Sequence, residues 1–252
     1  TFVYTLMMYL FAFIAMDIVS SILIYFMTCY LGRGNETNYV SGALLIAQVV
    51  ILPFYVWFSH KTSKRTGYML AAGVWIAIML TSFFLGPQNP GFVIYLFAAC
   101  VGFGTGGVIV MISSIFPDIP DVDELRSGQR REGLFSAMIG FMRKLSSAIA
   151  IFLVSQIIDI TGYIPPIEET INGVTRLIEQ AQPQSFINGL RAIFILIPIL
   201  FLLGGLFFAN KNKLTTQRYE HLQGLLEKKR KGQSLSEQEQ EQQKDLYQAL
   251  ID

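Results

Sequence analysis

Six long apolar stretches constrain the fold of this chain more than any other feature of its sequence. Each is close to or above the roughly 20 helical residues that cross a hydrocarbon core of about 30 Å. A backbone inside lipid must satisfy its own hydrogen bonds, and the alternating pattern of barrel strands is absent, so we expect helices. The stretches are approximately 3–31, 39–58, 68–85, 91–116, 133–161 and 189–209. The sequence therefore predicts an all-α, multi-pass membrane protein.

Charged residues divide the chain into two parts. Residues 1–209 contain 22 charged side chains, whereas the last 43 residues contain 15. Only 15% of the whole chain is charged, compared with about a quarter in a typical soluble domain. We therefore expect a six-helix transmembrane bundle over residues 1–209 and a water-exposed, helical tail over residues 210–252.

Helical patterns also occur outside the six apolar stretches. Residues 215–232 place four residues on one face of a predicted helix, namely Tyr219, Leu222, Leu225 and Leu226. A second tail helix opens with Ser234 and Glu237 at the spacing of a capping box. The segment "IEETINGVTRLIEQ" within the 162–188 connection is interpreted as a short surface helix.

Basic residues are distributed unequally between the two sets of connections. The connections 59–67 and 117–132 contain six lysines and arginines, whereas 32–38, 86–90 and 162–188 contain only Arg33 and Arg176. The positive-inside rule then predicts that both ends of this segment are cytoplasmic, in the cell (inner or plasma) membrane. The net charge of +1 gives no basic field that would attract nucleic acid, so we expect no nucleic-acid partner.

Arg143 and Lys144 stand side by side within an apolar run. A cation near the bilayer midplane costs from about 2.5 kcal/mol upward, so each should face a partner or a watery cavity. Adjacent helical residues project about 100° apart, so the two cations cannot both contact the same group equally well. Asp17 has a similar predicted depth and is a candidate counter-charge for one of them. The alternative is a buried ion pair with a structural role alone.

The segment 117–132 concentrates charges of both signs between two apolar stretches. Its acidic residues are Asp118, Asp121, Asp123, Glu124 and Glu132, and its basic residues are Arg126, Arg130 and Arg131. The spacing lacks the alternate acids and central glycine of a calcium loop. No nucleophile and base stand together there, and no metal cluster is evident, so we expect neither an enzyme nor a metal site. Breakable ion pairs that close an inner gate suit this position, and a merely solvated loop is the alternative.

The run "GFGTGG", residues 102–107, is only superficially similar to a phosphate-binding loop. It follows no strand, and no Lys-Ser/Thr pair completes such a motif. Gly102 and Gly106 are four residues apart within an apolar stretch. This spacing predicts close packing between helices.

The stretch "PDIPDVDELRSGQRREGLFSAMIGFMRKLSSAIAIFLVSQIIDITGY" resembles the helix 10 to helix 11 region of the glycoside-pentoside-hexuronide:cation symporters. These form the melibiose-permease branch of the major facilitator superfamily. The shared elements are an acidic loop, a following Arg and Glu, a mid-helix Lys and a terminal Gly-Tyr; here they are Asp118, Asp121, Glu124, Arg130, Glu132, Lys144, Gly162 and Tyr163. The resemblance covers about residues 1–209.

The resemblance implies that this chain is the C-terminal half, helices 7 to 12, of a twelve-helix transporter. The family couples solute entry to Na⁺, H⁺ or Li⁺ by alternating access, without another cofactor. Lys144 matches the family lysine linked to the cation and sugar sites, and we place Asp17 and Arg143 near it. Asp118, Asp121, Glu124 and Arg130 match charges of the cytoplasmic gate, and we include Arg131 and Glu132 with them. The implied partners are the N-terminal six-helix half, membrane lipid and a small solute.

Two alternatives to a glycoside symporter remain open at this point. The "RREG" motif, together with apolar residues 109–112, resembles the lysophospholipid-transporting branch of the same family. A non-transporting membrane scaffold is the alternative of another class. In a scaffold, however, the free-energy cost of placing Lys144 and Asp17 within the membrane would serve no purpose.

Overall fold

The computed structural model describes residues 1–129, 131–171, 174–178, 180–231 and 236–250. Within these residues, six helices are long and apolar enough to cross a membrane. They are α1 (Phe2–Tyr25), α2 (Thr37–Lys61), α3 (Lys64–Thr81), α4 (Gly91–Ile115), α6 (Glu132–Thr161) and α7 (Gln184–Lys211). All six predicted stretches are confirmed, and α1 continues through a π-helical turn at Phe26–Tyr30. The chain is an all-α, multi-pass membrane protein.

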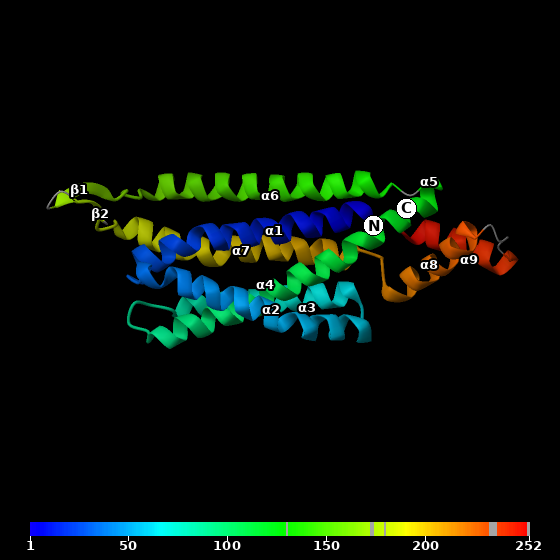
Figure 1. Ribbon diagram of the computed structural model, residues 1–252, viewed down its shortest axis with the longest axis horizontal. Coiled ribbons are helices and arrows are strands. Elements are labelled where there is room, and N and C mark those ends of the chain that lie inside the picture. The colour runs from blue at the N-terminus through cyan, green and yellow to red at the C-terminus, as the bar shows by residue number, and fades with distance from the viewer. Residues whose placement is uncertain (130, 172–173, 179, 232–235, 251–252) are drawn as a thin grey trace.

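The six helices form two neighbouring groups (Figure 1). Helix α4 packs against α2 and α3, and α1 packs between α7 and α6. Helix α6 contacts α1 far more than α7 and lies along the edge of the bundle. Its exposed face has large apolar side chains, including Leu134, Phe141, Ile151, Phe152 and Ile160. That face is therefore available to lipid or to a further helical bundle.

The two ends of the bundle have different structures (Figure 1). At one end, which we call the tail end, lie α5 (Ile119–Ser127), α8 (Thr216–Arg230) and α9 (Glu237–Leu250). At the other, the hairpin end, lie the strands β1 (Ile167–Ile171) and β2 (Val174–Ile178). The basic connections 59–67 and 117–132 are both at the tail end, because α2 and α4 run toward it and α3 and α6 run away from it.

The short helix expected within the 162–188 connection is replaced by a β-hairpin. Strands β1 and β2 are antiparallel, with Ile167 opposite Ile178 and Ile171 opposite Val174. The segment is rich in β-branched residues, which favour strands. The two residues between the strands, Asn172 and Gly173, lie outside the described residues, but in sequence they form the pair that most strongly signals a two-residue hairpin.

The glycine-rich run of α4 is a helix-packing motif, as predicted. A Cβ atom added to Gly102 would lie 2.4 Å from the carbonyl oxygen of Leu44, and one added to Gly106 would lie 2.9 Å from that of Gln48. Both acceptor atoms belong to the backbone of α2, so neither can move aside cheaply. The absence of side chains at Gly102 and Gly106 is what lets α2 approach α4 this closely.

Both predicted tail helices are present. Leu222, Leu225 and Leu226 of α8 are buried in an apolar cluster with residues of α5 and α9, which confirms the apolar face. The capping box is shifted by two residues from its predicted place. Ser236 and Glu239 exchange hydrogen bonds, with 3.0 Å from the Ser236 N–H to a Glu239 oxygen and 3.4 Å from the Glu239 N–H to Ser236 Oγ. The predicted cap residue Ser234 lies outside the described residues.

Candidate functional site

Asp17 and Arg143 join the middle of α1 to the middle of α6. Arg143 donates two hydrogen bonds to the Asp17 carboxylate, at 2.5 Å from Nη1 and 2.8 Å from Nη2. The guanidinium also lies 4.9 Å from the centre of the Phe13 ring, one turn earlier on α1. Two-point pairing of this kind fixes orientation as well as distance. Asp17 therefore lies at the depth predicted for it, beside one of the two cations of α6, and that cation is Arg143.

Lys144 projects away from this ion pair. It is exposed, and within the part of the chain that the structure describes it has neither a hydrogen bond nor an ion pair. The physical reason is the helical angle of about 100° between neighbouring residues, which turns Lys144 aside when Arg143 faces α1. Asp17 and Arg143 neutralise each other, so Lys144 contributes the net positive charge near the middle of α6.

Asp118 is held by a lysine of α3. The ammonium group of Lys64 donates to both carboxylate oxygens of Asp118, at 2.8 and 2.6 Å, and to the carbonyl oxygen of Ser114 at 2.9 Å. The Asp118 side chain is only 7% exposed. Lys64 therefore ties the first turn of α3 to the C-terminal end of α4.

Asp121 and Glu124 are held by two residues of α8. Arg230 donates to Asp121 at 3.0 Å and, through Nε, to Glu124 at 3.0 Å, and a second nitrogen also contacts Glu124. The hydroxyl group of Tyr219 donates to Asp121 at 2.9 Å. Hydrogen bonds to Glu124 and Asp121 raise the pKa of Arg230, and burial, together with the charges of Asp118 and Asp121, raises the pKa of Tyr219. Both shifts favour the protonated forms of the two side chains.

Two of the remaining residues assigned to the gate, Arg131 and Glu132, lie where α6 begins. Arg131 makes two hydrogen bonds with Asp123, at 2.9 and 2.7 Å, and Glu132 is the first residue of α6. Arg130 lies outside the described residues. The segment is a set of ion pairs rather than a merely solvated loop, whereas its role as a gate stays a prediction.

Sequence reasoning missed Lys64, Tyr219 and Arg230 as partners of these carboxylates. Their hydrogen bonds join residues 54, 98 and 109 positions apart, respectively. The available signals were the basic connection that contains Lys64 and the amphipathic pattern that places Tyr219 on the apolar face of α8. No local spacing connects either signal to residues 118–124.

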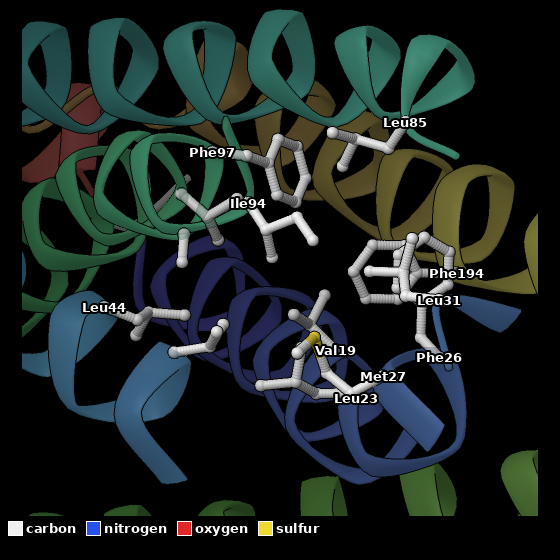
Figure 2. A pocket seen from close by; sticks show the side chains of 13 residues that line it. Val19, Leu23, Phe26, Met27, Leu31, Leu44, Leu85, Ile94, Phe97 and Phe194 are labelled. Atoms are coloured by element: carbon white, nitrogen blue, oxygen red, sulfur yellow. The ribbon is translucent and has the colours of Figure 1, made fainter. Parts of the chain in front are cut away.

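A small apolar pocket lies toward the hairpin end (Figure 2). Side chains from α1, α2, α4 and α7 converge on it, and the rings of Phe26 and Phe194 stack with their centres 4.3 Å apart. None of its 13 lining residues has a polar side chain, and its free volume is about 20 Å³. A sugar does not fit this space, so the pocket is a feature of packing in this conformation.

The apolar residues of α4 at 109–112 do not form one open wall. Met111 and Ile112 are fully buried in the core, whereas Ile109 and Val110 are partly exposed. The side of α4 that contains Met111 and Ile112 is therefore occupied by packing. Among the described residues, no group of three or more His, Cys, Asp or Glu side chains is placed to hold a metal ion.

Comparison with known proteins identifies several related symporters. The chain is 29% identical to an uncharacterized symporter of Synechocystis over 82% of its own length and 37% of the relative's. It is 30% identical to a putative sulfoquinovose importer of Escherichia coli over 57% of its length and 32% of the relative's. It is 23% identical to the sodium-dependent lysophosphatidylcholine symporter 1 of Gallus gallus over 62% of its length and 29% of the relative's.

The chain spans less than half the length of the curated relatives that it matches. The family model described as "MFS/sugar transport protein" matches residues 1–215, which include all six membrane-crossing helices. That description agrees with the resemblance found in the sequence, and it indicates transport rather than catalysis. With this match across its whole transmembrane part, the chain belongs to the MFS/sugar transport protein family.

Proposed function

We propose that this chain is the C-terminal half of a cation-coupled symporter that moves glycosides or related sugars by alternating access. The observation that carries the proposal is the arrangement of three charges near the middle of α1 and α6. Asp17 and Arg143 neutralise each other, and the exposed Lys144 is left without a partner among the described residues. The family and the relatives named as symporters support the same function.

An unpaired lysine at this depth needs a counter-charge. Placing a lysine at this depth costs about 2.5 kcal/mol or more, and in a structural scaffold no function would offset that cost. In the proposed transporter the counter-charge comes from the N-terminal six-helix half, which packs against the exposed faces of α1 and α6. A Na⁺ or H⁺ that neutralises the facing carboxylate then competes with Lys144, and this competition couples cation binding to the position of α6.

The net charge of the site narrows the class of sugar. Within this half, Asp17 neutralises Arg143, and Lys144 is left as a net positive charge. This balance favours a sugar that carries an acidic group, and one relative is named a putative sulfoquinovose importer. The second candidate solute is a lysophospholipid, which the chicken relative, named a sodium-dependent lysophosphatidylcholine symporter, favours.

The proposed orientation places the tail end in the cytoplasm of a cell with this protein in its inner or plasma membrane. The six basic residues in the connections at the tail end support this orientation. It puts α5, α8 and α9 at the cytoplasmic mouth of the transporter.

The test uses the complete polypeptide in proteoliposomes. Uptake of a radiolabelled galactoside, a sulfonated sugar and a lysophospholipid would be followed, each with and without an inward Na⁺ or H⁺ gradient. We expect gradient-stimulated uptake of at least one sugar. Uptake of the lysolipid alone would transfer the function to the second candidate, and movement of none of the three would contradict the proposal.

A further inference from the structure

We propose that Arg230 and Tyr219, in the tail, are positioning residues that hold α5 and its acidic side chains in place at the tail end of the transporter. The inference rests on the proposed function, because α5 matters to transport only if this end opens and closes. It assigns a role to the tail helix α8, which lies outside the transmembrane helices.

Arg230 binds two carboxylates of α5 with one guanidinium group. Asp121 and Glu124 are three residues apart and therefore lie on one face of the helix. Arg230 reaches both, at 3.0 Å to each, while its own side chain is 38% exposed. The planar fork of arginine suits this bridge, whereas a lysine offers a single point charge. Arg230 is also the last residue of α8, where a cation interacts favourably with the helix dipole.

Tyr219 makes a second contact three turns earlier on the same helix. Its hydroxyl group binds the Asp121 oxygen that Arg230 does not use, at 2.9 Å. The ammonium group of Lys64 lies 5.2 Å from the centre of the Tyr219 ring. A continuous series of contacts therefore runs from α3 through Lys64 and Tyr219 to Asp121 and Arg230. We call Arg230, Tyr219, Asp121 and Glu124 the tail clamp.

An apolar interface between α5 and α8 lies beside the tail clamp. Leu222, Leu225 and Leu226 lie between the two polar contacts on α8 and are at most 4% exposed. They pack with Ile119, Val122 and Leu125 of α5. Among the described residues, α5 contacts α8 more than it contacts any other element. The position of α5 therefore depends on the tail.

The clamp has a consequence for transport. Asp121 and Glu124 are two of the residues that the family resemblance assigns to the gate, and in this structure tail residues already neutralise them. A cation of the N-terminal half can pair with them only by sharing or displacing Arg230. The tail thus competes with the other half of the transporter for the same carboxylates.

Backbone hydrogen exchange of α5 in the complete protein, in lipid nanodiscs without added solute, tests the clamp directly. Arg230→Gln should raise the exchange of α5 and α8 by about 5- to 30-fold, which corresponds to the loss of one or two kcal/mol of local stability. Tyr219→Phe should raise it less, and Arg230→Lys should restore part of the protection. Lys229→Gln is the matched control, because it removes the same charge from the neighbouring, exposed position of α8.

The transport readout separates positioning from simple stability. Arg230→Gln should change the maximal uptake rate while leaving the KM for solute unchanged, because the clamp does not touch solute. Exchange equal to that of Lys229→Gln would overturn the proposal, as would faster exchange with an unaltered uptake rate. If Arg230→Gln fails to fold, Tyr219→Phe and Arg230→Lys carry the same test. Failure of the wild-type protein to move any solute would count against the proposed function, while the exchange result would still judge the clamp.

Discussion

Arg143 on α6 and Asp17 on α1 form a two-point ion pair that crosses between the two helices near their middle. Helix α6 has few other contacts with the bundle outside α1. The pair therefore sets the rotation of α6 about its own axis, and that rotation determines where Lys144 projects. A transporter that moves α6 must carry this pair along or break it.

The first prediction concerns the two members of this pair. Asp17→Asn or Arg143→Gln alone should destabilise the protein by about 1–2 kcal/mol, because each leaves one charge unpaired within the membrane region. This is below the 3–5 kcal/mol of a fully buried pair, since the Arg143 side chain is 38% exposed. Thermal unfolding in detergent measures the effect. The double variant should lose less stability than the sum of the two single losses. Strictly additive losses would contradict the coupling between the two residues.

Lys144 should control coupling rather than folding. Lys144→Gln removes a charge that has no partner among the described residues, so the folded yield should be unchanged or slightly higher. Gradient-stimulated uptake should fall by at least about tenfold, which for a rate corresponds to roughly 1.4 kcal/mol. Lys244→Gln removes an exposed lysine of α9 and is the control for charge alone. Full stimulated uptake in Lys144→Gln would exclude a coupling role.

A side chain at Gly102 should destabilise the protein. Gly102→Ala places a methyl group 2.4 Å from the Leu44 carbonyl oxygen, so α2 and α4 must separate. We expect a loss of about 1–3 kcal/mol, typical of overpacking, measured as a lower unfolding temperature. Gly73→Ala on α3 is the matched control, because nothing lies within 4 Å of its added Cβ. Equal effects of the two substitutions would disprove the close approach.

The same helix pair is also joined by a polar contact. Gln48 of α2 donates to the Thr105 hydroxyl of α4 at 2.8 Å. Interhelical hydrogen bonds in membrane proteins contribute about 0.6 kcal/mol on average, so Gln48→Leu should be mildly destabilising. A double-mutant cycle with Thr105→Val measures the pair itself, and a coupling energy of zero would show that the bond adds no stability.

Much of the fold could be predicted because lipid leaves few choices. Apolar length determined the six crossings, and the spacing of Gly102 and Gly106 indicated the α2–α4 packing before any contact was known. The error within the 162–188 connection arose because the helix-like spacing of its apolar residues was weighted above the Asn-Gly pair. In the sequence, the Asn-Gly pair is the signal that favours the two-stranded hairpin seen on either side of it.

The sequence by itself determined which residues are expensive to bury, namely Asp17, Arg143 and Lys144, because their cost follows from charge and depth alone. It could not decide which cation pairs with Asp17, since that depends on the rotation of α6 relative to α1. It also gave no sign that Asp121 and Glu124 meet Arg230, more than 100 residues away. Only the tertiary structure brings these residues together, because such contacts follow from the packing of whole helices and leave no local pattern in the chain.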